Sequence, residues 1–174
     1  MKSRLIYIEK PVAAKVEVNT VLSIAGFDPS GGAGVLSDIK TIHAHGLYGF
    51  GVCSAITIQN DAEFYSVNWL RPAEIIKQIE ALEKRFEISF VKIGLIENLY
   101  VLNDIINFFK NKKRMSQNIS AETRIIWDPI IQTSSGFTIH NNFDTKLLWE
   151  VCSKIHLITP NKPESVFLTG DNDP

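Results

Sequence analysis

Several classes of protein are excluded by what this sequence has little of. Cysteine occurs twice in 174 residues, as Cys53 and Cys152, which lie far apart in separate apolar stretches. This usage predicts reduced, buried thiols of a cytoplasmic protein, not a disulfide framework. A chain of this length buries roughly 70% of its unfolded surface, so it needs no disulfide or metal to stabilise a core.

Long apolar runs are also missing. None reaches the roughly 18 residues that cross a bilayer, which argues against a membrane span. The N-terminal segment carries Glu9, Lys10 and Pro11 where a secretory signal needs an unbroken apolar stretch. We therefore expect a cytoplasmic location and no membrane partner.

Neither sign of charge is in excess. The 18 Lys and Arg residues against 19 Asp and Glu residues give a net charge of −1. Without a cationic surplus, no nucleic-acid partner is expected. The composition, 45% hydrophobic and 21% charged, is that of an ordinary globular domain. One domain is predicted.

Short β-branched runs alternate with longer stretches of helical period from Val21 almost to the C-terminus. Polar connections are expected after the second run, as far as Leu70, and over residues 111–123. The predicted strands are residues 21–27, 50–58, 89–95, 124–130 and 156–159. The predicted helices are a segment with Val35, Leu36, Ile39 and Ile42 on one face, a segment from Pro72 with a buried stripe of Ile75, Ile76, Ile79, Leu82 and Phe86, and residues 97–110 and 143–154.

This alternation predicts an α/β fold with a mainly parallel central sheet and helices on both faces. The crossover connections should be right-handed. Residues 1–20 fit none of these units and are expected to form an extra edge strand or a loose arm. Residues 21–174 form the predicted α/β domain.

Ligands of open parallel sheets bind outside the carboxyl ends of the strands. After the first predicted strand comes Gly26-Phe27-Asp28-Pro29-Ser30-Gly31-Gly32-Ala33-Gly34. It matches neither a P-loop nor G-x-G-x-x-G. It is interpreted either as a tight connection or as a turn whose backbone approaches an anionic or planar ligand. Asp38 in the following helix is either a first-turn acid stabilised by the helix dipole or a ligand to a substrate hydroxyl.

Two further strand ends carry acidic residues. Asp128 before Pro129 is either a strand-ending turn or a carboxylate at the ligand edge. Asn161 and Glu164, three residues apart at a predicted helix start, form either a capping pair or, with Asp128, a site for hydrated Mg²⁺.

Five motifs occur in an order that resembles one known family. They are AGFDPSGGAGVLSDIKT (25–41), AITIQN (55–60), KIGL (92–95), WDPI (127–130) and ITPNKPE (158–164). Together they are similar to the hydroxymethylpyrimidine/phosphomethylpyrimidine kinases of thiamine biosynthesis, in the ribokinase-like superfamily. Pyridoxal kinases share several of these motifs, so pyridoxal phosphorylation is an alternative.

The resemblance implies a kinase that uses ATP and Mg²⁺ on 4-amino-5-hydroxymethyl-2-methylpyrimidine and then on its monophosphate. It implies a homodimer in full-length members. Phe27 stands where many members have a small polar residue, which predicts a changed pocket mouth. Asp128, Asn161 and Glu164 would position Mg²⁺ and the phosphates. The residues implied in the pyrimidine pocket are Gly26, Ala33, Asp38, Thr57, Gln59, Leu95 and Ile130.

Two elements of the family pattern are not found in the sequence. These are a Lys-Gly-Gly-His-like strand and a Gly-Thr-Gly-Cys or Gly-Thr-Gly-Asp loop, which the resemblance assigns to the anion hole and the residue that activates the hydroxyl. No catalytic residue is therefore assigned, and the chain is expected to be the N-terminal, pyrimidine-binding portion of a ribokinase-like domain, incomplete at its C-terminus. A non-catalytic pyrimidine-binding module is the alternative.

Overall fold

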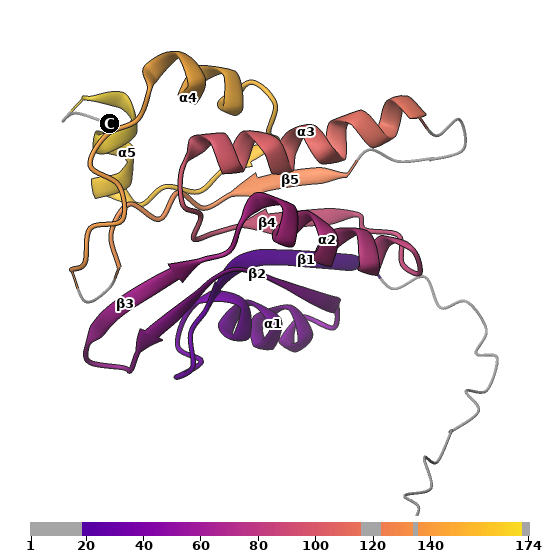
Figure 1. Ribbon diagram of the computed structural model, residues 1–174, viewed down its shortest axis with the longest axis horizontal. Helices are drawn as coiled ribbons and strands as arrows, with labels where there is room; N and C mark the ends of the chain where they lie inside the picture. The colour runs from indigo at the N-terminus through magenta and orange to yellow at the C-terminus, as the bar shows by residue number, and fades with distance from the viewer. Residues whose placement is uncertain (1–18, 116–122, 134–135, 172–174) are drawn as a thin grey trace, which may run out of the picture.

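The computed structural model describes residues 19–115, 123–133 and 136–171 (Figure 1). Strands and helices alternate along most of the chain, as the hydrophobic periods predict. Their order is β1 (Thr20–Phe27), α1 (Gly34–Ala44), β2 (Tyr48–Gln59), β3 (Phe64–Trp69), α2 (Pro72–Glu83), β4 (Phe90–Ile93), α3 (Leu99–Met115), β5 (Arg124–Trp127), α4 (Thr145–Cys152), β6 (Leu157–Ile158) and α5 (Lys162–Thr169).

The strands form one sheet of order β3-β2-β1-β4-β5-β6. Every neighbouring pair is parallel except β2 and β3, which are antiparallel. The prediction of a mainly parallel sheet is confirmed, but the predicted polar connection before Leu70 is wrong. Residues 64–69 pair with β2 because backbone hydrogen bonds along an exposed edge do not require an apolar run.

Helices cover both faces of the sheet. Helix α1 packs on β1 and β2 from one face, whereas α2 and α3 lie together on the other (Figure 1). Alternation along β1 sends Leu22 and Ile24, both fully buried, into the α2–α3 face. On that face the core continues through α2, α3 and the ends of β4 and β5, with Ile75, Ile79, Val91, Ile93, Leu102, Ile105, Ile106, Ile125 and Trp127.

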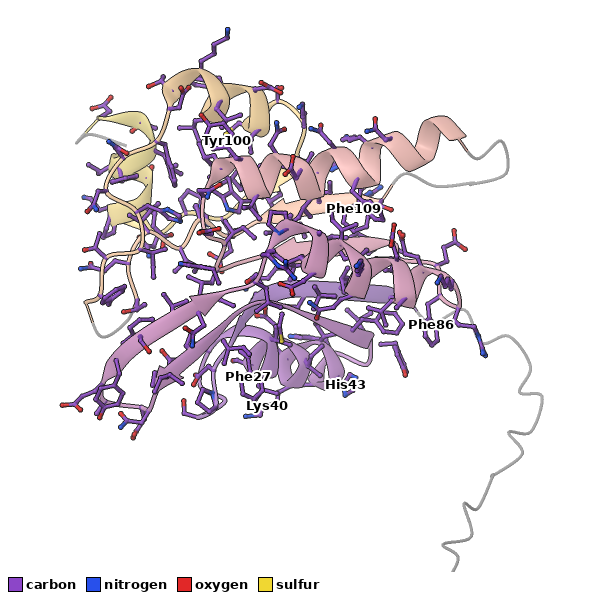
Figure 2. All side chains as sticks on the ribbon, in the orientation of Figure 1. Phe27, Lys40, His43, Phe86, Tyr100 and Phe109 are labelled. Carbon is purple, nitrogen blue, oxygen red and sulfur yellow. The ribbon has the colours of Figure 1, made fainter. Side chains whose placement is uncertain are left out.

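One residue of the predicted helical stripe is misplaced. Ile75 and Ile79 of α2 are buried as predicted, but Phe86 is 43% exposed. Helix α2 ends at Glu83, so Phe86 follows the C-cap and no longer shares the helical face. Its ring packs instead beside Phe50, at 4.7 Å between centroids, near the end of α2 (Figure 2).

Several boundaries differ from the sequence-based expectations. Helix α3 continues to Met115, beyond the predicted end at Lys110, and the rest of the expected 111–123 connection lies largely outside the described residues. The predicted N-terminal extension also lies outside them, except that Thr20 begins β1. Cys53 and Cys152 are free, as predicted, but only partly buried. None of the described helices has the length and apolar character to cross a membrane.

Candidate active site

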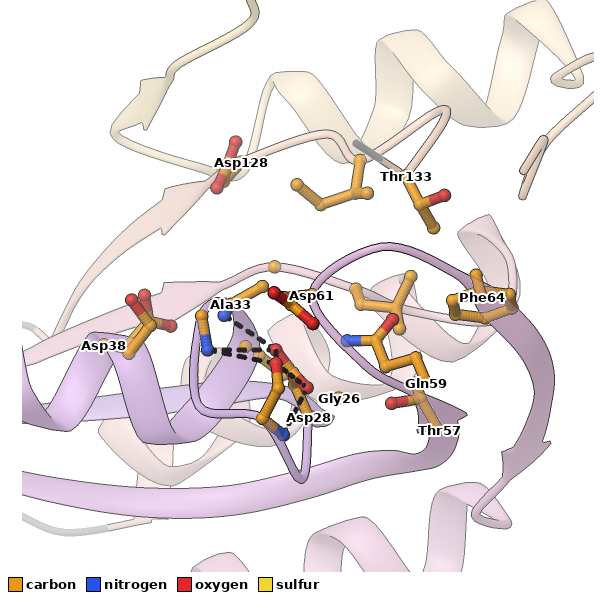
Figure 3. Close-up of a pocket in the computed structure, with 18 of the residues that line it drawn as sticks. Gly26, Asp28, Ala33, Asp38, Thr57, Gln59, Asp61, Phe64, Asp128 and Thr133 are labelled. Carbon is orange, nitrogen blue, oxygen red and sulfur yellow. Dashed lines mark hydrogen bonds between the residues drawn. The ribbon is translucent and has the colours of Figure 1, made fainter. Parts of the chain in front are cut away.

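A cavity of about 460 Å³ opens at the carboxyl ends of β1, β2, β4 and β5 (Figure 3). This is the sheet edge at which the parallel topology predicts ligand binding. Residues far apart in the sequence meet there because parallel strands bring all their carboxyl ends to one side. The cavity is lined by all seven residues predicted for the pyrimidine pocket, namely Gly26, Ala33, Asp38, Thr57, Gln59, Leu95 and Ile130, and by Asp128.

The glycine-rich turn between β1 and α1 is organised around its own carboxylate. Asp28 is only 3% exposed. Its oxygens accept backbone hydrogen bonds from Ser30 (2.8 Å), Gly32 (3.1 Å) and Ala33 (2.9 Å), and a fourth from the Ser30 hydroxyl. Such converging N–H groups at a helix start form an anion site. Here the anion is Asp28, so these donors are already occupied.

Gly34 makes this turn possible. Its φ of +60° lies in the left-handed region, and a Cβ there would collide with the carbonyl oxygen of Gly26. The close approach joins the end of β1 to the first residue of α1. The turn is therefore a tight connection that also lines the cavity, and the approach of its backbone to a ligand stays a prediction.

Asp28 has an unusually stable charge for a buried acid. Burial would raise the pKa of Asp28, but hydrogen bonds from the Gln59 side chain, Ser30 and Ala33 outweigh it and lower the pKa below its ordinary value of 3.8. Asp28 and Gln59, at the end of β2, both line the cavity.

Thr57 and Gly26 shape the floor of the cavity. The Thr57 hydroxyl donates to the carbonyl of Phe27 at 2.9 Å, so its proton is engaged within the protein. A Cβ at Gly26 would lie 2.7 Å from Leu95 Cδ2, which explains why glycine suits that position. Phe27 itself is not among the described residues that line the cavity, because alternation along β1 turns it away from Gly26. The predicted effect of Phe27 on the pocket mouth stays a prediction.

Asp38 is held by a partly buried lysine and a serine. Lys92 Nζ, from β4, lies 3.1 and 3.0 Å from the two carboxylate oxygens of Asp38, and Ser23 Oγ donates to Asp38 at 2.6 Å. The alternative that Asp38 is a first-turn acid is wrong, because α1 begins at Gly34 and has no acid in its first turn. The carboxylate faces the cavity from the second turn.

Lys92 also reaches Asp128 at the end of β5, with 3.2 Å between Nζ and Oδ2. Among the described residues that line the cavity it is the only lysine or arginine, against four aspartates. Sequence reasoning missed this residue, although the signal was present as a charged position inside the otherwise apolar strand segment FVKIGL. The missing information was which carboxylates the sheet places beside it.

Asn161 and Glu164 form the capping pair that the sequence allows. The Asn161 side chain accepts from the Glu164 N–H at 2.9 Å, and the Glu164 carboxylate accepts from the Asn161 N–H at 2.8 Å. Neither is among the residues that line the cavity. The capping interpretation is confirmed, while their predicted role toward Mg²⁺ and phosphate stays a prediction.

Glu164 is buried, at 5% exposure, and its charge is poorly compensated. Burial raises the pKa of Glu164 above its ordinary value, and the negative charge of Asp128 raises it further, while backbone hydrogen bonds from Asn161 and Ile131 oppose both. Within the described residues, no group of three His, Cys, Asp or Glu side chains converges as a ready metal site. The Asp128 and Glu164 carboxylates are nonetheless close enough to repel each other.

Residues from β3 and from the segment after β5 complete the rim. Phe64 lines the cavity and stacks on Phe137, with 4.7 Å between ring centroids, and Thr133 lies across from it (Figure 3). These residues were not predicted for the site. Finding them required knowing that β3 extends the sheet beside β2.

The fold and the cavity are those of a ribokinase-like α/β protein, with the ligand edge formed by four strand ends. A solved phosphomethylpyrimidine kinase from Clostridium difficile 630 superposes with a TM-score of 0.72 at 32% identity, covering 88% of this chain and 63% of that one. A pyridoxal kinase from Staphylococcus aureus in complex with ADP gives 0.68 at 23% identity, covering 89% and 53%, and shows the shared fold alone.

The sequence comparisons identify the family. A family model described as phosphomethylpyrimidine kinase matches residues 28–173. The chain is 36% identical over 151 residues to the hydroxymethylpyrimidine/phosphomethylpyrimidine kinase of Aquifex aeolicus, covering 86% of this chain and 56% of the relative. The Escherichia coli K12 enzyme is 30% identical over 150 residues, covering 84% and 53%. The chain belongs to the phosphomethylpyrimidine kinase family and spans about half the length of these curated relatives.

Proposed function

We propose that this chain carries the pyrimidine-binding part of a kinase that phosphorylates 4-amino-5-hydroxymethyl-2-methylpyrimidine, and then its monophosphate, for thiamine diphosphate biosynthesis. The observation that supports this most is the convergence of Gln59, Asp38 and Leu95 on one cavity of about 460 Å³. A cavity of this size suits a small heterocycle. Family membership supplies the reaction.

Each side chain has a role that its chemistry suits. The Gln59 amide both donates and accepts, which matches the ring nitrogen and exocyclic amine of an aminopyrimidine. Asp38, fixed by Lys92 and Ser23, accepts from the pyrimidine or its hydroxymethyl arm. Leu95 and Ile130 supply apolar walls. The glycines and Ala33 of the β1–α1 turn allow the ring to approach the backbone.

Asp128, Glu164 and Asn161 are the residues that would hold Mg²⁺ and orient phosphate groups. The donor set fits, because Mg²⁺ favours one or two carboxylates completed by water and phosphate oxygens. The mutual repulsion that raises the pKa of Glu164 is what a cation between Asp128 and Glu164 would relieve. Held there with ATP, such an ion would neutralise negative charge on the phosphate groups. We assign no catalytic base to this chain.

We further propose a cytoplasmic location and a homodimer. Support for the dimer comes from β2, where Ile56 and Ile58 are 46% and 50% exposed on the same face of the strand. Sedimentation of the chain should then give twice the 19.6 kDa monomer mass. Replacement Ile58→Glu should return it to a monomer.

Calorimetry and a phosphorylation assay test the function. The chain should bind the hydroxymethylpyrimidine, and Gln59→Ala should weaken binding by roughly 1 to 3 kcal/mol. Gln78→Ala removes a matched amide that bonds to the Cys53 backbone outside the cavity, and should leave the affinity unchanged. Equal affinity of the unaltered chain and Gln59→Ala would refute this binding mode, and stronger binding of pyridoxal would favour that substrate.

A turnover assay distinguishes an active kinase from a non-catalytic pyrimidine-binding module. Phosphorylation by this chain with ATP and Mg²⁺ would show that the described half of the family pattern suffices. Binding of the pyrimidine that is insensitive to ATP, with no turnover, would support a pyrimidine-binding part that depends on further structure for catalysis.

A further inference from the structure

A polar side chain lies inside an interior strand of the sheet. Ser23 of β1 is fully buried, between Leu22 and Ile24, which face the core under α2 and α3. Because side chains alternate along a strand, Ser23 faces α1 on the opposite side of the sheet. A buried hydroxyl without a hydrogen-bond partner destabilises a fold. The partner of Ser23 therefore indicates what this hydroxyl does.

That partner is the carboxylate of Asp38 on α1. The Ser23 hydroxyl donates to Asp38 Oδ2 at 2.6 Å. Lys92 is the direct neighbour of Ser23 on β4 in the register of the sheet, and its Nζ lies 3.0 Å from the same oxygen. Asp38 and Lys92 line the cavity, whereas Ser23 is not among the lining residues. An effect of Ser23 on a bound ligand therefore has to pass through another side chain.

Close packing of α1 on the sheet makes this contact possible. Gly51 of β2 is the register neighbour of Ser23 on the other side of β1. A Cβ at Gly51 would lie 2.5 Å from Val35 Cγ1 of α1, so only glycine leaves room for the helix at this separation. Because α1 lies this near the strands, the short side chain of Ser23 reaches Asp38.

The two donors to Asp38 differ in how firmly they are placed. Lys92 has a long, flexible side chain, and its Nζ also lies 3.2 Å from Asp128 Oδ2. It can therefore follow a displaced Asp38 carboxylate or be drawn toward Asp128. Ser23 has a short side chain with one torsion between backbone and hydroxyl oxygen, and its strand is paired on both sides. The Ser23 hydroxyl is thus the rigid donor of the two.

We propose that Ser23 is a positioning residue that fixes the Asp38 carboxylate for hydrogen bonding to the ligand in the cavity. The inference rests on the proposed function, in which Asp38 accepts a hydrogen bond from the pyrimidine or its hydroxymethyl arm. Asp38 Oδ2 accepts from both Ser23 and Lys92, whereas Oδ1 accepts from Lys92. Oδ1 is therefore the oxygen with more capacity for a donor group of the ligand.

Calorimetry on the whole chain with 4-amino-5-hydroxymethyl-2-methylpyrimidine tests the role of Ser23. Ser23→Ala removes the hydroxyl and should weaken binding about tenfold, because the Asp38 carboxylate is no longer held in one place. Thr20→Val is the matched control. It removes another hydroxyl of β1, which donates to the Glu87 carbonyl at the end of the strand away from the cavity, and should leave the affinity unchanged. Unchanged affinity in Ser23→Ala would overturn the inference.

A double substitution shows whether Ser23 acts through Asp38. In the Asp38→Ala background, Ser23→Ala should cause no further loss of affinity, because the carboxylate that Ser23 holds is gone. NMR titration extends the measurement to the weak binding expected of these variants. A merely structural role of Ser23, in the packing of α1 on β1, would weaken binding by the same factor in both backgrounds. That result would overturn the inference.

Ser23→Cys covers the case in which Ser23→Ala does not fold. Its thiol fills the same place in the buried strand but donates only weakly, so the affinity should fall about threefold or more. Affinity equal to that of the unaltered chain would overturn the inference. Binding that depends on Asp38 but not on Ser23 would overturn this inference alone, whereas failure of the unaltered chain to bind the pyrimidine would overturn the proposed function.

Discussion

Two buried acids, Asp28 in the cavity wall and Glu164 outside it, have pKa values shifted in opposite directions. Asp28 and Glu164 are 3% and 5% exposed, so burial penalises the charge of each. The pKa of Asp28 is nevertheless lowered, because hydrogen bonds from Gln59, Ser30 and Ala33 outweigh burial. The pKa of Glu164 is raised by burial and by the charge of Asp128, which backbone hydrogen bonds from Asn161 and Ile131 do not overcome.

This difference distinguishes two parts of the site. In the β1–α1 turn the charge of Asp28 is compensated by hydrogen-bond donors, whereas around Asp128 and Glu164 the negative charge is not fully compensated. The β1–α1 turn supplies its own anion to its own donors, so it needs no external charge. Around Asp128 and Glu164 the described residues carry more negative charge than Lys92 neutralises. A bound cation would offset the excess negative charge of the second part and would change little in the first. For this reason the metal and phosphates are assigned to the second part.

The largest expected effect on stability is that of replacing Asp28, the compensated acid. Replacing it with Asn removes a charge that the turn donors face and leaves at least one donor unpaired, so unfolding free energy should fall by about 2 to 3 kcal/mol. Glu164→Gln removes an uncompensated charge while retaining an acceptor for the cap. It should change stability by less than about 1 kcal/mol at neutral pH, toward higher stability. Urea unfolding measures both.

Ser30→Ala is the control for the turn. It removes the hydroxyl donor to Asp28 but keeps the backbone N–H bonds, so it should cost about 1 kcal/mol. If Glu164→Gln proved as destabilising as Asp28→Asn, the two carboxylates would be equally well compensated and the distinction between the two parts would be wrong.

A smaller effect is expected at the lysine that joins the two parts. Lys92→Met leaves Asp38 and Asp128 without their shared counter-ion. Because these side chains are 20 to 28% exposed, the loss of stability should be about 1 kcal/mol. Asp38 also loses the group that orients it, so pyrimidine affinity measured by calorimetry should fall.

Lys154→Met provides a matched control outside the cavity. Lys154 is 26% exposed, against 27% for Lys92, and bonds to Glu150, Asn103 and Asn107. It should lose a similar amount of stability and retain full pyrimidine affinity. Equal pyrimidine affinity of the two lysine variants would show that Lys92 does not contribute to binding and acts only in structural ion pairs.

The sequence predicted the elements whose buried apolar residues recur at the period of a strand or a helix. Strands β1, β2, β4 and β5 and helices α1 to α4 contain apolar positions whose spacing reflects the face they bury. Strand β3 was missed because Phe64–Trp69 forms an antiparallel edge, where FYSVNW need not be apolar. Phe86 was placed in the core because residue spacing does not show where α2 ends.

For the site, the sequence indicated which residues lie there more reliably than which residues they contact. Strand ends and family motifs led to Gln59, Asp38 and Asp128, and all of them line the cavity. The sequence did not reveal that Asp28 fills its own turn or that Lys92 joins two aspartates, and it left open whether Asn161 and Glu164 form a capping pair or a Mg²⁺ site. The Lys92 contacts depend on distances across the sheet, and the Asp28 contacts depend on the backbone conformation of its turn. Residue types and spacing along one chain determine neither.

The smallest expected effect is a difference in pH dependence. An acid with a lowered folded pKa stabilises the protein above its unfolded pKa and loses that contribution as pH falls, whereas an acid with a raised folded pKa behaves in the opposite way. The contribution of Asp28 should therefore be lost below pH 3.8, its ordinary value. That of Glu164 is fully present below its ordinary value of 4.5 and should be lost as pH rises through the raised pKa.

Asp128→Asn tests the cause of the Glu164 shift. The stability of the unaltered chain relative to Glu164→Gln should decline as pH rises above 4.5, in urea unfolding at a series of pH values. In the Asp128→Asn background the same comparison should give a shallower decline, because the repulsion is gone and burial alone remains to raise the pKa. An unchanged slope would mean that Asp128 does not act on Glu164, and that the two carboxylates do not share the charge excess assigned to this part of the site.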